Sequence, residues 1–172
     1  RAVKSLNLRR PVSAILLVLV LAVIFYPSFA MGVVTLKITD SGALPGEPIY
    51  AKCSKIALHR IGEGEKTGWI ELINMTSTYD LTSLRNITET LLRSRITAGH
   101  YDKIRFAWAE AIAVLNGSRV NLSVSQPGVT LSLELSISNG EERILLLDFK
   151  TNSTKARTDR LLQNSPTITI LK

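Results

Sequence analysis

Cysteine is nearly absent from this chain, and histidine is scarce. The 172 residues include one cysteine, Cys53, and two histidines, His59 and His100. A lone cysteine excludes a disulfide-stapled miniprotein, and a closed zinc site needs about four Cys or His ligands within one chain. The length is typical of one compact domain. We therefore expect a single domain without a zinc centre built from its own side chains.

Acidic residues are also outnumbered, because 14 Asp and Glu face 21 Lys and Arg, for a formal net charge of +7. Four of the positive charges lie in residues 1–10, which leaves only +3 for the rest of the chain. No basic cluster on one expected face indicates a nucleic-acid partner. With 45% hydrophobic and 20% charged residues, the composition excludes an intrinsically disordered chain.

Charge is missing altogether from residues 11–36, in which an apolar run is densest over 14–26. A helix over residues 11–30 would have the roughly 20 residues needed to span a bilayer. The basic segment before it favours a cytoplasmic N-terminus, since positive flanks stay on that side. We divide the chain accordingly into a basic segment (1–10), a hydrophobic helix (11–30) and an extracytoplasmic domain (31–172).

Two interpretations of the hydrophobic helix stay open. Its dense apolar core has the length found in signal peptides, Pro27 would end the helix, and Ser28-Phe29-Ala30 is a small-x-small cleavage pattern. The alternative is a retained helix that anchors the chain in a membrane or packs against other helices. Both interpretations place residues 31–172 outside the cytoplasm.

The segment from Arg9 to Leu17 resembles the processing region of archaeal type IV pilins, in which a basic pair precedes a small residue and a long apolar helix. The resemblance implies a helix that packs in the core of an extracellular filament. Pro27 departs from the family pattern, because pilin helices usually run longer.

Five Asn-x-Ser/Thr sequons follow the hydrophobic helix. The chain has only eight asparagines, so five sequons exceed what chance placement of Ser and Thr would give. We predict N-glycans, and therefore exposed side chains, at Asn74, Asn86, Asn116, Asn121 and Asn152. The alternative is a Ser/Thr-rich β protein with asparagines in its turns. A glycosylated and anchored chain fits an archaeal or eukaryotic surface, and the pilin resemblance favours the archaeal one.

Strand patterns fill most of the remaining sequence. Alternating apolar and polar residues over 33–40 and 129–138 are typical of strands with one buried face. Asn116-Gly117 and Asn139-Gly140 are strong hairpin signals. Further strands are expected over 49–61 (with a bulge near Ser54), 69–73, 101–108, 109–115, 120–124, 143–149 and 167–171.

Between Asp80 and Arg95 the apolar residues recur at helical spacing instead, which predicts one or two short helical turns. The number and spacing of the strands predict an all-β fold, an antiparallel β-sandwich of about eight strands. The hydrophobic helix would precede this sandwich in the chain.

A series of short motifs occurs in order along the outer domain: Thr39-Asp40, Gly68-Trp69, Tyr79-Asp80-Leu81, Ala98-Gly99-His100-Tyr101, Ile104-Arg105, Leu147-Asp148-Phe149 and Pro166-Thr167-Ile168. In these motifs the chain resembles a β-sandwich domain of unknown function found in prokaryotic secreted proteins and lipoproteins. The resemblance implies an envelope location and a sandwich fold, and it implies no established activity. Lys150 stands where this family usually has a second Asp, so the acidic pair of the family is incomplete here.

Residues suited to catalysis are few, because the sequence has no phosphate-binding glycine loop, His-x-x-x-His pair or Ser-x-x-Lys arrangement. We expect Tyr101 to reach a backbone partner with its hydroxyl, and Arg105 to pair with Asp80 or Asp148. Trp69 and Trp108 are expected in packing.

Four aspartates could supply oxygen ligands to Ca²⁺ if loops gathered them: Asp40, Asp80, Asp102 and Asp148. They lack the spacing of an EF-hand loop. We therefore name no catalytic, cofactor-binding or metal-binding residues, and we expect no enzymatic activity.

These observations favour a non-enzymatic structural protein of the cell surface that acts through subunit contacts. Its most specific form is a subunit of a pilus-like extracellular filament. The expected partners are a membrane, through residues 11–30, further copies of the chain or other envelope proteins, and N-glycans. The alternatives are a single-span accessory subunit of a membrane complex, or a secreted binding module after signal cleavage.

Overall fold

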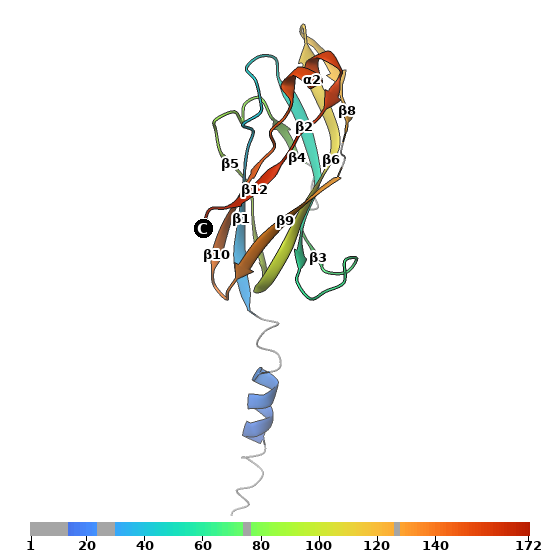
Figure 1. Ribbon diagram of the computed structural model, residues 1–172. Coiled ribbons are helices and arrows are strands. Elements are labelled where there is room, and N and C mark those ends of the chain that lie inside the picture. The colour runs from blue at the N-terminus through green and yellow to red at the C-terminus, as the bar shows by residue number, and fades with distance from the viewer. Residues whose placement is uncertain (1–13, 24–29, 74–76, 126–127) are drawn as a thin grey trace, which may run out of the picture.

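The computed structural model describes residues 14–23, 30–73, 77–125 and 128–172, which form a mainly β domain and a short N-terminal helix (Figure 1). The N-terminal helix spans 14–23, and a second helix, α2 (Ser153–Thr158), lies near the C-terminus. The strands are β1 (Met31–Thr39), β2 (Ile49–Arg60), β3 (Trp69–Ile73), β4 (Ser77–Asp80), β5 (Glu89–Thr97), β6 (Gly99–Leu115), β7 (Ser118–Asn121), β8 (Ser123–Val124), β9 (Gly128–Ile137), β10 (Glu142–Asp148), β11 (Leu161–Leu162) and β12 (Thr167–Ile170).

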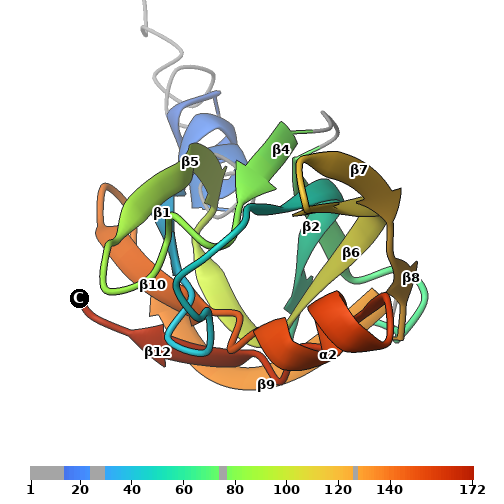
Figure 2. The same cartoon turned by 90° about the horizontal axis from the view of Figure 1, so that it is seen from above.

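Two sheets contain most of these strands (Figure 2). The four-stranded sheet has the order β12-β10-β1-β5, in which β1 runs parallel to β10 and the other pairs are antiparallel. The six-stranded sheet is antiparallel and has the order β3-β2-β6-β7, with β4 also paired to β2 and β9 to β6. The prediction of an all-β, mainly antiparallel domain is confirmed, and the expected number of strands was too low.

One hydrophobic core is shared by the two larger sheets. Fully buried side chains enter it from both, among them Leu36 on β1 and Leu58 on β2. The rings of Phe106, Trp108 and Phe149 meet in this core, with centroids 4.8 to 5.8 Å apart in tilted or edge-to-face arrangements. Such contacts add to the gain from burying aromatic surface. Trp108 is therefore a packing residue, as the sequence predicts.

Three register shifts interrupt the long β2–β6 pair: two lie close together in its middle, and the third lies between His59 and Arg60. The register passes from Cys53–Trp108 to Lys55–Ala107, so Ser54 has no partner and is the predicted bulge. On the facing strand Ala109 is skipped in the same way, between the partners of Lys52 and Cys53. This second bulge resets the alternation of β6 without ending the strand. The two strands expected over 101–108 and 109–115 are therefore one.

The helical turns expected between Asp80 and Arg95 do not form. Residues 81–86 make a turn, in which Leu81 and Leu84 are buried, and β5 follows directly. Leu91 is an extra residue at a register shift opposite β1, so that both Leu91 and Leu92 pack against the core. A turn followed by a bulged strand therefore places buried leucines at intervals that resemble the spacing of a helix. The short helix of this domain is α2, elsewhere in the chain.

The N-terminal helix is apolar on every side. Its large side chains are between 42% (Leu21) and 75% (Val23) exposed. The described part of the chain includes no helix with both the length and the apolarity to cross a membrane. The basic segment 1–10 and the rest of the predicted helix, except residue 30, lie outside the described residues.

Tyr101 closes one end of the core, as the sequence predicts. The side chain is fully buried, and its hydroxyl donates a hydrogen bond to the carbonyl oxygen of Thr97 (2.5 Å). Gly99 lies between the two residues with a φ of 157°, a conformation that residues with a side chain rarely adopt. The bond therefore spans a sharp entry into β6.

We predict that Tyr101→Phe lowers the free energy of unfolding by about 1 to 2 kcal/mol, because the carbonyl of Thr97 loses a buried donor. Urea unfolding followed by tryptophan fluorescence measures the change. Tyr50→Phe is the matched control, since Tyr50 is half-exposed and its hydroxyl makes no hydrogen bond with the described residues. Equal effects of the two substitutions would contradict this role for Tyr101.

Candidate functional site

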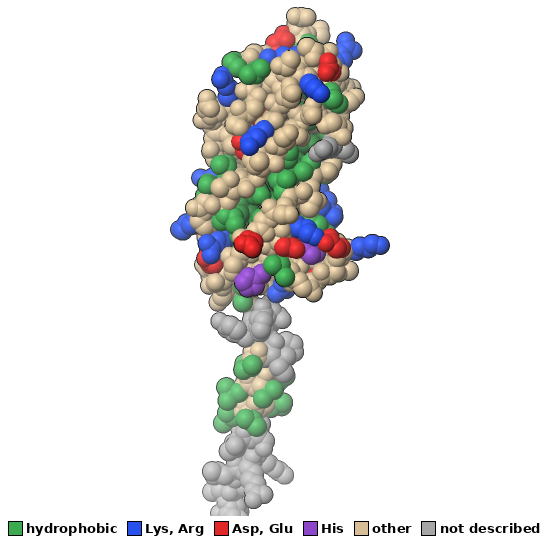
Figure 3. All heavy atoms as spheres, viewed as in Figure 1, with side chains coloured by type: hydrophobic (Ala, Val, Ile, Leu, Met, Phe, Trp, Pro, Cys, Tyr) green, Lys and Arg blue, Asp and Glu red, His purple; other side chains and the backbone are tan. Residues whose placement is uncertain are grey.

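The two ends of the β domain carry different features. We call the end at which β1 begins the near end, and the end at which β1 stops the far end. At the near end, the carbonyl of Met31 accepts a hydrogen bond from Gly140 N–H (2.8 Å). At the far end β1 is followed by Asp40, whose backbone N–H donates to the carbonyl of Leu84 (3.2 Å). Because β10 runs parallel to β1, it also points toward the far end. Charged side chains gather at the near end in Figure 3.

Four of the five predicted glycosylation positions lie at or close to the far end. The turn that contains Asn86 accepts a backbone hydrogen bond from Asp40, through the carbonyl of Leu84. Asn152 is the N-cap residue of α2, at the same end of the domain. Asn116 and Asn121 lie at the junction of β6 with β7, next to the start of β2. All four side chains are exposed, which is the accessibility that a glycan requires.

Local structure accounts for three of these asparagines without a glycan. Asn86 and Asn116 adopt positive φ angles (58° and 51°), which asparagine tolerates in turns. Asn152 caps α2 by accepting a hydrogen bond from Lys155 N–H (3.1 Å). Asn121 has neither role, because it lies in β7 opposite Ile112. The fifth position, Asn74, lies outside the described residues.

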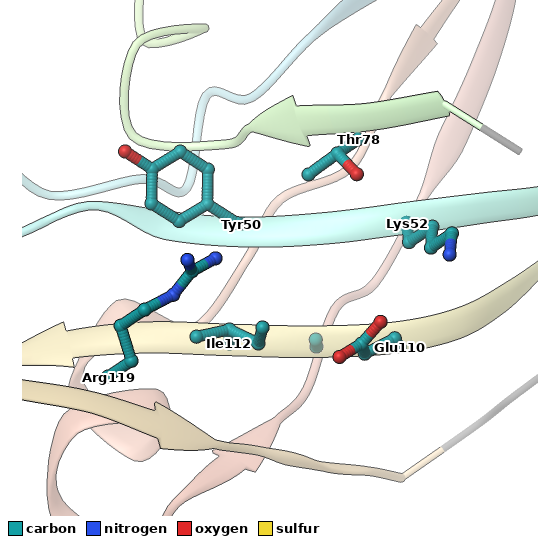
Figure 4. Close-up of a pocket in the computed structure, with 7 residues that line it drawn as sticks. Tyr50, Lys52, Thr78, Glu110, Ile112 and Arg119 are labelled. Carbon is teal, nitrogen blue, oxygen red and sulfur yellow. The ribbon is translucent and has the colours of Figure 1, made fainter.

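A shallow hollow lies on the outer face of the six-stranded sheet, close to Asn121. Its volume is about 170 Å³, and its lining comes from β2, β4, β6 and β7 (Figure 4). The residues that line this β2–β6 hollow are Tyr50, Lys52, Thr78, Glu110, Ala111, Ile112 and Arg119.

The β2–β6 hollow combines an aromatic ring and an aliphatic side chain with charged and hydroxyl groups. Tyr50 and Ile112 are cross-strand partners and half-buried, so they form its apolar part. The side-chain polar atoms of the lining residues make no hydrogen bonds or ion pairs with one another. Donors and acceptors there remain available to a ligand that offers both.

Asp40 and Asp148, two of the three aspartates in the matching pieces of the family resemblance, lie close together at the far end of the four-stranded sheet. Asp40 is fully buried, and its Oδ1 accepts hydrogen bonds from the backbone N–H groups of Gly42, Ala43 and Thr151 (2.9 to 3.1 Å). Asp148 accepts from the backbone and the hydroxyl of Ser41. These bonds join the ends of β1 and β10.

Burial raises the pKa of Asp40, while hydrogen bonds from Thr151 and Gly42 oppose this rise. The calcium ligands considered from the sequence are not gathered in one place. Asp80 accepts the N–H groups of Thr82 and Ser83 in its own turn, and Asp102 contacts His59. Within the part of the chain that the structure describes, no group of three or more His, Cys, Asp or Glu side chains is placed to hold a metal ion.

A polar cluster that the sequence does not reveal holds the hairpin between β2 and β3. His59 is 4% exposed, its Nδ1 lies 2.7 Å from Asp102 Oδ1, and its Nε2 lies 3.4 Å from the carbonyl oxygen of Gly64. The ring of Trp69 packs against the imidazole at 5.1 Å, and the Trp69 indole N–H donates to the carbonyl of Glu65 (2.7 Å). These contacts depend on strand register, which no local motif encodes.

The expected pairing of Arg105 with Asp80 or Asp148 is wrong. The guanidinium of Arg105 lies over the indole of Trp69 instead, 4.1 Å from the ring centroid. A cation is attracted to the face of an indole, and the guanidinium also stacks well on it. Asp80 accepts a backbone N–H group of its own turn, and Asp148 accepts the backbone N–H of Ser41 beyond β1, so neither needs a distant arginine.

The protein is thus an all-β domain in which the polar clusters around Asp40, Asp148 and His59 form hydrogen bonds to turns and hairpins of the same chain. The chain belongs to the family described as a domain of unknown function, DUF4382, whose model matches residues 31–161. This membership agrees with the resemblance to an uncharacterised domain that its sequence shows. No curated protein and no solved structure matches the chain.

We predict that the contact of His59 with Asp102 makes stability depend on pH in acid. The hydrogen bond from His59 holds the pKa of Asp102 below its usual value of 3.8. A carboxyl that is more acidic in the folded chain stabilises the fold above its unfolded pKa, and this gain is lost as pH falls through the folded pKa. Asp102→Asn should therefore lower the Tm at neutral pH, and the difference from the native chain should shrink below about pH 4.

Thermal unfolding of the two chains between about pH 7 and pH 3 measures this dependence. Asp159→Asn is the control, because Asp159 is exposed and has no ion pair with the described residues. A difference in Tm between the native chain and Asp102→Asn that stays constant over this range would refute the assignment.

Proposed function

We propose that this chain is a structural protein of the cell surface, held by its N-terminal hydrophobic helix and acting through contacts of an outward, N-glycosylated β-sandwich. In the most specific form, it is a subunit of a pilus-like extracellular filament. The observation that carries the proposal is a contrast in burial. The β domain has its own hydrophobic core, whereas the large apolar side chains of the helix 14–23 are exposed.

The exposed helix is the strongest support. Burying a Val, Leu or Ile side chain is worth about 1.5 to 3 kcal/mol, and the helix 14–23 exposes eight large ones. A helix that is apolar all round belongs in the interior of a bundle or in a bilayer. A membrane, or the helices of further copies, would supply that interior.

The placement of the sequons gives a second support. The chain enters the β domain at the near end, through Met31, whereas the four described sequon asparagines lie at or close to the opposite end. Glycans there would point away from whatever holds the helix. The flanks of the sheets would stay available for contacts with neighbours.

The sheet edges offer surfaces for such contacts. In the described residues β9 pairs only with β6, and β12 only with β10. Apolar side chains that are half-buried against the core, or exposed in the case of Ile170, lie along these two strands: Val129, Leu131, Leu133, Ile168 and Ile170. Figure 3 shows a stripe of hydrophobic side chains across the middle of this face of the β domain. An unpaired strand with an apolar lining can accept a strand from a partner.

A single-span accessory subunit of a membrane complex is the second candidate, favoured by the same helix if it lies alone among the helices of other chains. A secreted binding module is the third, if the chain is cleaved after Ala30. Imaging of the native assembly separates the first two, because a filament shows helical symmetry with copies in contact through residues 11–30. Mass spectrometry of the mature N-terminus identifies the third.

We predict that the double substitution Leu17→Arg and Leu21→Arg releases the chain from filaments or membranes into the soluble fraction. The two positions lie one turn apart on the helix, and each arginine costs about 2.5 to 3.5 kcal/mol at the centre of a membrane helix. Sedimentation and electron microscopy of extracts measure the change.

Leu44→Arg is the matched control for this substitution, because Leu44 is an exposed leucine (45%) in the loop between β1 and β2, outside the sheet edges, and should not affect sedimentation. The proposal fails if the double variant sediments as the native chain does, or if the native mature chain begins at Met31.

A further inference from the structure

We propose that the β2–β6 hollow holds the first sugar of a glycan attached to Asn121 of the same chain. The inference rests on the proposed function in one respect, since it requires that Asn121 is glycosylated. It adds a binding site for carbohydrate on the β domain and assigns the six-stranded sheet face a specific occupant.

The strand register places Asn121 at the rim of the hollow. Asn121 pairs with Ile112, and Arg119, two residues earlier on β7, pairs with Val114. Directly opposite partners in a sheet share a face, as do residues two apart on one strand. Asn121 therefore lies on the same face as Ile112 and Arg119, which both line the hollow. In Figure 4 Arg119 lies beside Tyr50, on the side of the hollow that β7 forms.

The lining suits a sugar ring. A pyranose has faces made of C–H groups and a rim of hydroxyls that both donate and accept hydrogen bonds. Tyr50 and Ile112 offer an apolar surface for such a face, while Glu110 accepts and Lys52 and Arg119 donate. These side chains make no hydrogen bonds or ion pairs with one another.

The size of the hollow points to a small occupant. Pockets for drug-sized ligands start at about 300 Å³, whereas this one has about 170 Å³. A single ring of a larger chain fits such a volume. A sugar tethered to Asn121 is present at high effective concentration, so that even a weak site would be filled.

Asn116 is the sequon to compare with Asn121, because neither Asn116 nor Gly117, which form the tight turn, lines the hollow. The Asn116 side chain is exposed, so a glycan on it would extend into solvent. The two positions are five residues apart in the sequence, which makes Asn116 an internal control for Asn121.

The test compares how fast the two glycans are released from the folded protein. The full chain, secreted by a eukaryotic host that attaches oligomannose glycans and kept in detergent, is treated with endoglycosidase H, and peptide mass spectrometry follows each site. A docked first sugar should slow release at Asn121 relative to Asn116. Tyr50→Ala and Arg119→Ala should each speed release at Asn121 by about three- to tenfold and leave Asn116 unchanged.

Arg119 is exposed, so its substitution keeps the proposal testable even if Tyr50→Ala fails to fold. Ser123→Ala and Ser118→Ala remove the two sequons singly and assign each released glycan to its site. Equal release at both positions, with no response to Arg119→Ala, overturns the docking while the glycosylated surface protein stands. An unmodified Asn121 in the secreted chain overturns the docking together with the glycan at this position.

Discussion

The parallel pairing of β1 with β10 is the constraint on which the rest of the structure depends. It joins the first strand of the β domain to one of its last, in unbroken register from Val33–Glu142 to Thr39–Asp148. A parallel pair cannot be closed by a short turn, so the chain between the two strands must leave the sheet and return. All six strands of the second sheet lie in this excursion. Asp40 and Asp148 complete the pairing by binding backbone N–H groups beyond each strand.

The same pairing separates the two ends of the domain. Because β1 and β10 point the same way, the chain enters at the near end and reaches α2 and Asn152 at the far end. The β domain completes its core from its own two sheets, whereas the helix 14–23 leaves its apolar side chains uncovered. Under the proposed function, folding would use the hydrophobic effect within the chain, and attachment of the helix would use it toward a partner.

Sequence reasoning succeeded where structure is decided locally. Alternation identified β1 and β9, the break near Ser54 identified a bulge, and the Tyr101 hydroxyl found the backbone partner expected for it. Sequence reasoning failed where the structure depends on pairing between strands that are distant in the sequence. The spacing of apolar residues before β5 looked helical because a turn and a bulge both direct leucines into the core. The partner of Arg105 is a tryptophan 36 residues earlier in the sequence, and only the sheet register brings the two together.

His59 and Asp102 resemble an acid–base pair, but their surroundings fit a structural role better. General base catalysis needs a ring nitrogen within reach of a substrate proton. Both nitrogens of His59 face oxygen acceptors of the chain, the side chain is almost fully buried, and Trp69 packs against the ring. The contact therefore fastens the hairpin between β2 and β3. In the β2–β6 hollow, by contrast, the polar side-chain atoms of the lining residues make no hydrogen bonds with one another, and the hollow lies on an open sheet face. Recognition of a ligand is better supported there than chemistry is at the histidine.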